Sequence, residues 1–363
     1  MPIKTLEVND VRNLHRAKLQ CSPLANLIVG PNGSGKTSLL ESITMLSQGK
    51  SFRKTQKKSV IADAQDNLTI SALLSCVGQF DADVRVGISK FSNGKTLAKI
   101  ANEKIGRVSE VASLLPVCVI EPNSTEVIEG SPSVRRQVLD WGVFHVEHSF
   151  IGQWRIFSNA LRQRNALLKH RTSDTSQLKY WDAILCPAAE EITRARLRYF
   201  EDLENELAGS LAFFFDTTPV TVTVDNGWDI TSSFVECLES NLDKDRRYGY
   251  TSVGPHKADL SIMTCGHMAK DFLSRGQKKL SVYALRLAQV EHYQRVTGNK
   301  VTLLLDDLPS ELDKANCKKV CQQIKRLGCQ VFITSIDSSD LNNMITEVLS
   351  PKVFHVEHGV MTP

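Results

Sequence analysis

The sequence predicts an α/β protein whose core is interrupted by a mainly helical insertion. Three observations lead to this fold class. Near the amino terminus, the apolar strand 25–29 is followed by a glycine-rich turn and an amphipathic helix. From residue 276 onward, helices alternate with the apolar strands 301–305 and 330–334, which is typical of parallel strands joined by helices. Between these parts, residues 130–215 carry long amphipathic helical runs.

The elements between these landmarks follow in order along the chain. The expected strands lie at 3–8, 68–74, 83–88, 97–100, 117–120, 219–224 and 259–263. The expected helices lie at 36–47, 135–150 and 190–211, with further helices from 276 and from 314. Pro187 is predicted to interrupt the helical region, because proline lacks an amide donor. We therefore expect the first half of the core at 1–125, the insertion lobe at 126–250 and the second half of the core at 251–363.

The composition is that of a folded protein without a membrane span. Of the 363 residues, 42% are hydrophobic and 23% are charged, which is enough apolar material for a sizeable core. A helix that crosses a bilayer needs about 20 apolar residues, and the longest mostly apolar stretch, 111–120, is short and contains a proline. The start lacks a basic segment that leads into an apolar run, and the nine cysteines are scattered. We expect a cytoplasmic protein with reduced thiols.

The positive charge is concentrated near the amino terminus. Residues 1–60 carry ten Lys or Arg and three Asp or Glu, whereas residues 181–250 carry six and fourteen. The densest basic run contains no acid and consists of Lys50, Arg53, Lys54, Lys57 and Lys58. A solvated surface is the commoner role of such a run, but beside a nucleotide site it is a candidate contact with DNA phosphates. The same two interpretations apply to a basic cluster in the helical region, Arg162, Arg164, Lys169, His170 and Arg171.

A phosphate-binding loop is the strongest single motif. It comprises Gly30, Pro31, Asn32, Gly33, Ser34, Gly35, Lys36 and Thr37, between a predicted strand and a predicted helix. Its glycines allow a tight turn in which several amides and the positive end of the helix face phosphate. Lys36 is expected to reach the β- and γ-phosphates of ATP, and Thr37 to hold Mg²⁺.

Two carboxylates end the apolar strand 301–305. Asp306 is the expected second protein ligand of Mg²⁺, directly or through water. Asp307 lies where a carboxylate could orient or deprotonate the attacking water. An isolated Asp-Asp pair after a strand is more often a capped loop, and the phosphate-binding loop is what favours the catalytic interpretation.

The spacing of these motifs indicates the subclass of nucleotide-binding protein. Asp306 follows Lys36 by 306 − 36 = 270 residues, and a helix start with Ser274, Gly276 and Gln277 precedes it. That helix start could bind phosphate or simply cap its helix. The order is typical of ABC-type ATPases. In that class, ATP lies between the phosphate-binding loop of one head and the signature of another head, a helix start like the one with Ser274, Gly276 and Gln277. Ser274, Gly276 and Gln277 are therefore expected to serve a partner's ATP in an ATP-dependent homodimer.

The sequence resembles, from end to end, the RecF family of bacterial DNA replication and repair ATPases, which are related to SMC-type heads. The resemblance is carried by Asp-Val-Arg-Asn at 10–13, Gly-Lys-Ser-Phe-Arg at 49–53, Gly-Ser-Pro at 130–132, Arg135 and Arg136, Leu-Asp-Trp at 139–141, Thr-Ser-Val-Gly-Pro-His at 251–256, Asp306 and Asp307, and Ser-Glu-Leu-Asp at 310–313. It implies an ABC/SMC-type head and a cytoplasmic, ATP-dependent DNA-binding dimer with slow, DNA-stimulated hydrolysis.

The same resemblance implies a cellular role and partners. Members act at single-strand gaps and stalled forks, where RecR and RecO help to load RecA, with the SOS response downstream. This sequence departs from the family pattern at Lys257 and Ala258, where Arg and Asp are usual, at Lys279 and at Asn123. Lysine replaces a rigid bidentate cation by a point charge, which leaves the role of the loop around 257 open.

Two other functions fit the sequence less well. A nucleotide-binding subunit of a membrane transporter is the main alternative, and the long helical insertion argues against it. A scaffold that does not hydrolyse ATP is disfavoured because Lys36, Asp306, Asp307 and Ser274 are all present. The segment Phe-His-Val-Glu-His occurs at 144–148 and 354–358, but the first is predicted helical, the second strand-like, and zinc needs further ligands. Cys317 and Cys321 share a helix face and are expected to be a buried pair.

Overall fold

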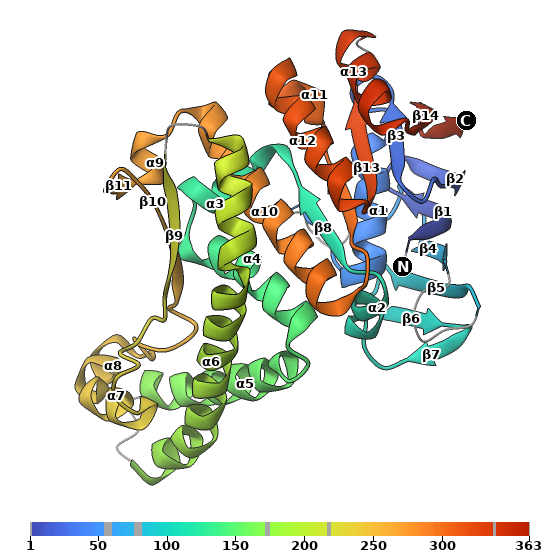
Figure 1. Ribbon diagram of the computed structural model, residues 1–363. Helices are drawn as coiled ribbons and strands as arrows, with labels where there is room; N and C mark the ends of the chain where they lie inside the picture. The colour runs from blue at the N-terminus through green and yellow to red at the C-terminus, as the bar shows by residue number, and fades with distance from the viewer. Residues whose placement is uncertain are drawn as a thin grey trace. The chain divides into compact units, whose positions relative to one another are not determined.

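The chain forms two compact units. In this computed structural model the described residues are 2–53, 60–75, 82–170, 175–215, 219–336 and 339–362. The first unit contains residues 1–124 and 283–363, and the second contains 125–282 (Figure 1). The boundary expected at 250/251 therefore differs from the observed one at 282/283. The difference arises because a small sheet and the segment that follows it pack with the helices of the insertion.

A mostly parallel sheet forms one layer of the first unit. Its strands lie in the order β15-β14-β3-β13-β12-β8, and neighbours from β14 to β8 pair in parallel. Their bounds are β3 (Ala25–Val29), β8 (Val117–Ile120), β12 (Thr302–Leu305), β13 (Gln330–Ser335), β14 (Lys352–Glu357) and β15 (Val360–Thr362). Every residue of β3, β12 and β13 is buried, as in a sheet covered on both faces. The predicted alternation of helices and parallel strands is confirmed.

An antiparallel sheet forms a second layer of the same unit. Its order is β2-β1-β4-β5-β6-β7, with β1 (Ile3–Val11), β2 (Leu14–Gln20), β4 (Asn67–Leu74), β5 (Val84–Phe91), β6 (Thr96–Ile100) and β7 (Glu103–Ile105). Strands β2 and β7 were not expected from the sequence. In β2 only Leu14, Ala17 and Leu19 are buried, and the other four residues are polar or charged, so the apolar pattern of the strand is weak.

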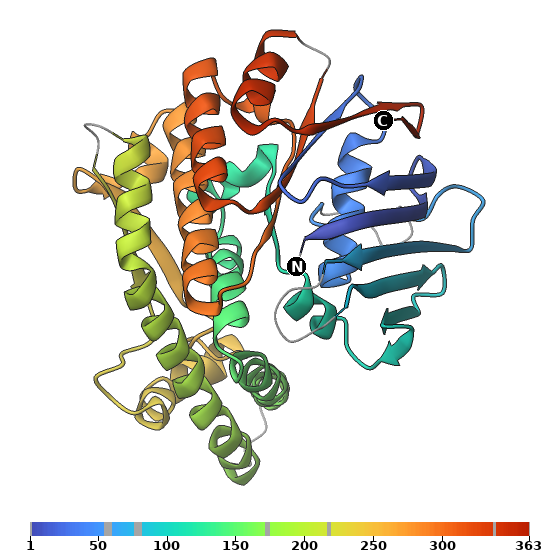
Figure 2. The same ribbon diagram turned by 45° about the vertical axis from the view of Figure 1, so that its right-hand side comes forward.

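Helix α1 (Lys36–Gln48) lies beside both sheets and joins them into one core (Figure 2). Its buried Leu39 and Ile43 belong to the same apolar cluster as Leu6 of β1 and Phe332 of β13. A helix buried on both sides is held by its packing, so its amino-terminal end is a fixed point in the unit. That end follows the phosphate-binding loop.

The other helices of this unit include α2 (Ser109–Leu114), α11 (Leu308–Glu311), α12 (Lys314–Leu327) and α13 (Ser339–Leu349). Helix α10 (Arg275–Thr297) begins in the second unit and ends in the first. On α12, Cys317 and Cys321 are fully buried on one face, as predicted. Within the part of the chain that the structure describes, no helix combines the length and apolarity that a bilayer crossing requires.

The second unit is a set of helices with a three-stranded sheet. The helices are α3 (Glu126–Glu129), α4 (Pro132–Val146), α5 (Phe150–Lys169), α6 (Thr175–Phe214), α7 (Phe234–Ser240), α8 (Leu242–Tyr248) and α9 (Ala269–Phe272). The sheet order is β11-β10-β9, with β9 (Val220–Asp225), β10 (Asp259–Thr264) and β11 (His267–Met268). Helices α5 and α6 pack along each other.

The predicted interruption at Pro187 is wrong, because α6 continues through this residue. Pro187 is exposed, whereas its neighbours Cys186 and Ala188 are buried. The carbonyl of Ala183, which loses its helical partner, is therefore on the side that water reaches. Packing on the opposite face of the helix offsets the loss of about 3 kcal/mol that an interior proline causes.

Arg164 corrects the interpretation of the basic cluster in the helical region. Its side chain is fully buried, with Nε 2.7 Å from Asp182 Oδ1 and Nη1 2.8 Å from both Asp245 Oδ2 and Thr251 Oγ1. Arg164 thus ties α5 to α6, α8 and the segment after α8, and it cannot contact DNA. Arg162, Lys169 and His170 are exposed, and Arg171 lies outside the described residues.

Several motif residues of the second unit have the same structural role. Arg196 forms a bidentate pair with Asp140 at 2.8 and 2.9 Å and donates to the Pro255 carbonyl. Arg135 pairs with Asp259 at 2.6 and 2.9 Å. A neighbour, Arg136, donates at 2.7 Å to the main-chain carbonyl of residue 258, so alanine at that position is compatible with this contact. Buried arginines that lose such a partner destabilise a protein strongly.

The two Phe-His-Val-Glu-His segments differ in structure, as predicted. His145 lies in the last turn of α4, whereas His355 lies on β14. Among the described residues, no group of three His, Cys, Asp or Glu side chains is close enough to hold a metal ion.

His256 makes the second unit sensitive to acid. Its Nε2 lies 3.0 Å from the Thr251 carbonyl, its ring packs against Phe157, and burial lowers its pKa to about 4. The unfolded chain then binds more protons than the native chain as the pH falls from 6.5 toward 4, so stability decreases by about 3 kcal/mol over that window. We expect this loss in urea unfolding followed by tryptophan fluorescence.

The matched variant is His256→Gln, which keeps a donor for the Thr251 carbonyl but has no titration near neutral pH. The free energy of unfolding of the wild type, relative to that of the variant, should be lower at pH 4.5 than at pH 7. A difference that stays constant over this range would contradict the assignment.

Candidate nucleotide-binding site

The phosphate-binding loop joins β3 to α1 and is shaped by its glycines. Gly33 and Gly35 have φ angles of 78° and 120°, a region that favours glycine. At Gly30 a Cβ atom would lie 2.2 Å from the Val356 carbonyl oxygen, so no larger residue fits there. The loop is therefore closed tightly enough for its amides and the start of α1 to face one point.

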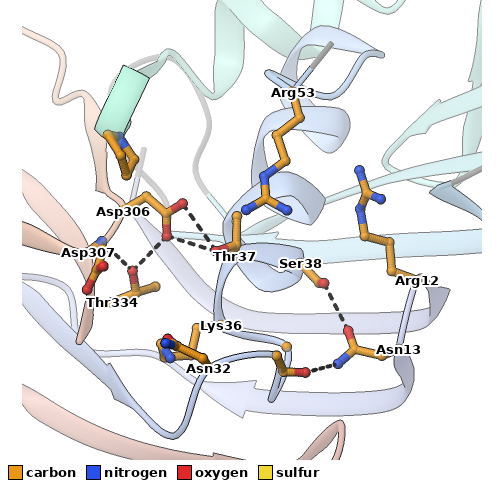
Figure 3. Close-up of a pocket in the computed structure, with 13 residues that line it drawn as sticks. Arg12, Asn13, Asn32, Lys36, Thr37, Ser38, Arg53, Asp306, Asp307 and Thr334 are labelled. Carbon is orange, nitrogen blue, oxygen red and sulfur yellow. Dashed lines mark hydrogen bonds between the residues drawn. The ribbon is translucent and has the colours of Figure 1, made fainter. Parts of the chain in front are cut away.

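Asn13 supports this loop from the turn between β1 and β2. Its Nδ2 donates to the Gly33 carbonyl at 2.9 Å, and its Oδ1 accepts a hydrogen bond from Ser38 Oγ at 3.0 Å (Figure 3). The side chain thus links the loop to the first turn of the helix. Sequence reasoning assigned Asn13 no role, although the family resemblance included its segment.

Lys36 lies folded along the loop. Its Nζ donates to the carbonyls of Gly30 at 2.6 Å and Pro31 at 2.9 Å. Burial lowers the pKa of the amine, and the nearby carboxylates of Asp307 and Asp306 oppose that effect. The ammonium group is held by two neutral acceptors, so a phosphate oxygen could replace them without loss of an ion pair.

Asp306 and Thr37 are brought together as the sequence predicted. Thr37 Oγ1 donates to the Asp306 carboxylate, 3.0 Å from Oδ1 and 3.2 Å from Oδ2. Thr334, at the end of the adjacent strand β13, donates to the same Oδ1 at 2.8 Å. Burial raises the pKa of Asp306. A hydroxyl and a carboxylate at this distance match the oxygen donors that Mg²⁺ prefers.

Asp307 is held in an unusual backbone conformation at the same edge of the sheet. Its φ is 57°, and its amide donates to Thr334 Oγ1 at 2.7 Å. Its Oδ1 is buried and has no hydrogen-bond partner within the described part of the chain. Left-handed conformations of this kind are unfavourable by about 1–2 kcal/mol and occur at functional sites. Asp307 is also one of the residues that line the cavity described next, and an unpaired buried acceptor of this kind is rare in a folded protein.

These side chains line a cavity of about 470 Å³. Its lining residues are Arg12, Asn13, Asn32, Gly33, Gly35, Lys36, Thr37, Ser38, Arg53, Pro122, Asp306, Asp307 and Thr334. Arg12 is oriented by Glu41, a fully buried residue of α1, with Nη2 2.8 Å from Oε1. Three cations, Lys36, Arg12 and Arg53, therefore share the cavity with two carboxylates, which suits a polyphosphate with a divalent ion.

Arg53 was expected to contact DNA, but it lies in this cavity. Its guanidinium group points toward Thr37 (Figure 3), and its charge opposes the rise in the Asp306 pKa. The structure thus places Arg53 beside the phosphate-binding loop, and its contact with DNA stays a prediction. Of the other residues in that basic run, Lys50 is exposed, and Lys54, Lys57 and Lys58 lie outside the described residues.

The hairpin β14–β15 packs against the phosphate-binding loop on the side away from the cavity. The Gly359 amide donates to the Ser34 carbonyl at 2.9 Å, and a Cβ atom on Gly359 would lie 2.1 Å from the Asn13 carbonyl oxygen. With φ at 78°, this position is also unfavourable for other residues. A segment remote in sequence therefore fixes the loop from outside the cavity.

We expect Gly359→Ala to weaken nucleotide binding by about tenfold with little change in the turnover number, because the chain must shift to relieve the clash near Asn13. Titration with a fluorescent ATP analogue and steady-state phosphate release measure the two effects separately. Gly94→Ala is the control, since Gly94 also has a positive φ but its Cβ would meet nothing within 4 Å. Equal losses in both variants would remove Gly359 from the site.

Ser274, Gly276 and Gln277 belong to the other compact unit, at the start of α10. Ser274 Oγ accepts a hydrogen bond from the Gln277 amide, and Gln277 Oε1 accepts one from the Ser274 amide at 2.9 Å, which is a capping box. Ser274 and Gln277 therefore cap the start of α10 in this chain, and their contact with a partner's ATP stays a prediction. Ser274 and Gly276 are exposed, so the amino-terminal end of the helix is open to solvent.

Comparisons with known proteins agree over the whole chain. The family model described as RecF/RecN/SMC N terminal domain matches residues 2–362. Two curated proteins named DNA replication and repair protein RecF, from Stutzerimonas stutzeri and Idiomarina loihiensis, are each 39% identical, over 100% and 99% of this chain and 97% and 99% of theirs. A solved structure of the recombination mediator protein RecF with ATP, from the RecFOR pathway, matches with TM-score 0.88 at 27% identity, over 99% of this chain and 97% of that one.

An SMC head bound to the C-winged helix domain of ScpA matches with TM-score 0.60 at 16% identity, over 100% of this chain and 96% of that one. At this identity the match shows a common fold. The predicted α/β head of ABC/SMC type is confirmed.

Proposed function

This chain belongs to the RecF family, and from that premise we propose that it is an ATP-dependent DNA-binding protein of recombinational repair and replication-fork maintenance. Its relatives are named for DNA replication and repair, and a RecF structure contains ATP. These names favour the repair class over the alternative of a transporter subunit. The residues that would hold ATP in this chain are those of the cavity described above.

The hydrogen bond between Thr37 and Asp306 is the observation that carries the ATP-binding part of the proposal. It joins the residue after the loop lysine to the carboxylate that ends β12, at 3.0 Å. When bound there, Mg²⁺ would supply charge neutralisation for the phosphates. Thr37 and Asp306 would hold the ion, Lys36 would neutralise phosphate oxygens, and the three glycines would present amides. Arg12 and Arg53 would add charge at the open side of the cavity.

Asp307 is the residue that supports hydrolysis rather than binding alone. Its side chain belongs to a residue that lines the cavity beside Asp306, and the carboxylate could accept a proton or a hydrogen bond from a water molecule there. We propose slow, DNA-stimulated hydrolysis that serves as a switch between bound states.

A second copy of the chain would complete the site. Ser274 and Gly276 at the exposed start of α10 present a hydroxyl, amides and the positive end of a 23-residue helix. In a head dimer these groups would contact the γ-phosphate held by the partner's loop. ATP would then join two heads, and hydrolysis would separate them. RecO and RecR, with RecA downstream, are the partners that the family resemblance implies.

The test combines DNA binding with mass in solution. Fluorescence anisotropy on gapped DNA, with and without ATP, should show tighter binding with ATP, and sedimentation should show a monomer that becomes a dimer under the same condition. DNA binding that does not respond to ATP, or ATP binding without a dimer, would contradict the proposal.

A further inference from the structure

We propose that Tyr248 and Tyr250 form a stacking site for unpaired bases of single-stranded DNA in the second unit. We call Tyr248, Tyr250 and Lys257 the tyrosine site. The inference rests on the DNA-binding part of the proposed function, and it names a surface and a form of DNA that the nucleotide cavity does not suggest.

The two rings lie next to each other in solvent. Their centroids are 5.7 Å apart and their planes differ by 17°, and the residues are 54% and 44% exposed. Gly249 between them has a φ of 74°, which turns the chain so that both rings lie on one side. Exposed, parallel aromatic faces are uncommon on a surface that binds nothing, because burying them in a core or an interface removes apolar area from water.

Hydrogen bonds to the neighbouring helices fix the segment that carries the two rings. The Gly249 amide donates to the Asp245 carbonyl at 2.7 Å, and the amide of Thr251 donates to Asn165 Oδ1 at 2.8 Å. Asp245 and Thr251 both accept hydrogen bonds from the buried Arg164. The tyrosines therefore lie on a fixed part of the second unit, where α8 packs beside the end of α5 (Figure 1). Little conformational entropy is then lost when a ligand stacks on them.

One cation contacts the Tyr250 ring, and three more lie near the rings in the fold or in the sequence. Lys257 Nζ lies 4.9 Å from the centre of the Tyr250 ring, in a cation–π contact. Lys169 at the end of α5 is close to the turn, since a Cβ on Gly249 would lie 3.5 Å from its Cα atom. Arg246 and Arg247 precede Tyr248 on α8 and are exposed. Among the described residues, none of these four cations forms an ion pair with a carboxylate.

This combination fits single-stranded DNA better than duplex DNA or a protein. Every base offers a flat face to an aromatic ring, but in a duplex those faces are already stacked, so only an unpaired strand can use both the rings and the cations. The cations suit a phosphate backbone, and a protein partner of opposite charge would not need parallel rings. The usual arginine is replaced here by Lys257, which still supplies the charge above the ring.

The experiment compares Tyr248→Ala and Tyr250→Ala with Tyr248→Phe and Tyr250→Phe, all with ATP present. The probes are a single-stranded oligonucleotide, a blunt duplex of the same sequence, and a strand with 2-aminopurine, whose fluorescence is quenched on stacking. We expect each alanine variant to bind the single strand about tenfold more weakly with reduced quenching. The phenylalanine variants should retain binding, because they keep the ring, and duplex binding should change less than twofold.

Tyr180→Ala is the matched control, because Tyr180 is 62% exposed on α6 of the same unit and contacts Trp181 edge-on rather than in a parallel stack. Thermal unfolding verifies that all variants fold. Unchanged single-strand binding in both alanine variants, or an equal loss on duplex, would overturn the tyrosine site while leaving the proposed function intact. A wild type that binds none of the DNA probes would overturn both.

Discussion

Replacing Lys36 by arginine should reduce ATP hydrolysis by about two to three orders of magnitude, while ATP affinity falls only about tenfold. Lys36 is 8% exposed, and its amine lies within 2.9 Å of two loop carbonyls. A planar guanidinium is larger and cannot occupy that position without opening the loop. The charge is kept, so attraction to phosphate remains, but the ion no longer reaches the oxygens where charge develops.

Single-turnover phosphate release and ATP titration separate the two quantities. Lys18→Arg is the control, since Lys18 is an exposed residue of β2 that pairs with Glu7 at 2.9 Å. A Lys36→Arg protein that hydrolyses ATP at the wild-type rate would remove Lys36 from the mechanism.

The second large effect concerns the sharing of one site between two chains. Gly276→Glu should bind ATP normally yet fail to dimerise or hydrolyse it, because a carboxylate at the start of α10 repels phosphate. Gly276 has no atom within 4 Å of its Cβ position and is not needed for the capping box of Ser274 and Gln277, so the helix should remain intact. Lys36→Met should not hydrolyse ATP, because methionine lacks the charge that stabilises the phosphate oxygens.

An equal mixture of Gly276→Glu and Lys36→Met should regain up to about half of wild-type hydrolysis. Neither variant forms an active dimer with itself, whereas each mixed dimer has one of its two sites with an intact loop and an intact signature. Phosphate release during titration of one variant into the other measures this recovery. Sedimentation must show that mixed dimers form, and mixed dimers that remain inactive would rule out a shared site.

The chemistry of the nucleotide site was predictable because its parts follow a local pattern. A glycine-rich turn between a strand and a helix, and an apolar strand that ends in two acids, can be recognised in the chain without knowledge of its packing. The meeting of Thr37 and Asp306 followed from the rule that the carboxyl ends of parallel strands lie at one edge of a sheet. The same rule pointed to Thr334, which sequence reasoning did not use.

Residues whose role depends on distant partners were not predictable. Arg164 has the appearance of a surface cation in its own helix, and its partners Asp245 and Thr251 lie 81 and 87 residues further along the chain. Arg53 belongs to a basic run, and a run of charges does not reveal which of its members turns toward the cavity. Strand β2 was not predicted because its exposed face is strongly charged. The turn that positions Asn13 was therefore not predicted either.

The contact between Gly359 and Ser34 has a consequence for how the protein is made. The loop emerges from the ribosome early, whereas β14 pairs with β3 only after nearly the whole sequence has been translated. At about 5–20 residues per second this interval lasts on the order of tens of seconds. During it, β3 lacks a neighbouring strand and its apolar residues are available to chaperones or to other nascent chains. A chain that ends before Gly359 would lack the hydrogen bond to Ser34, so its phosphate-binding loop would lose this support.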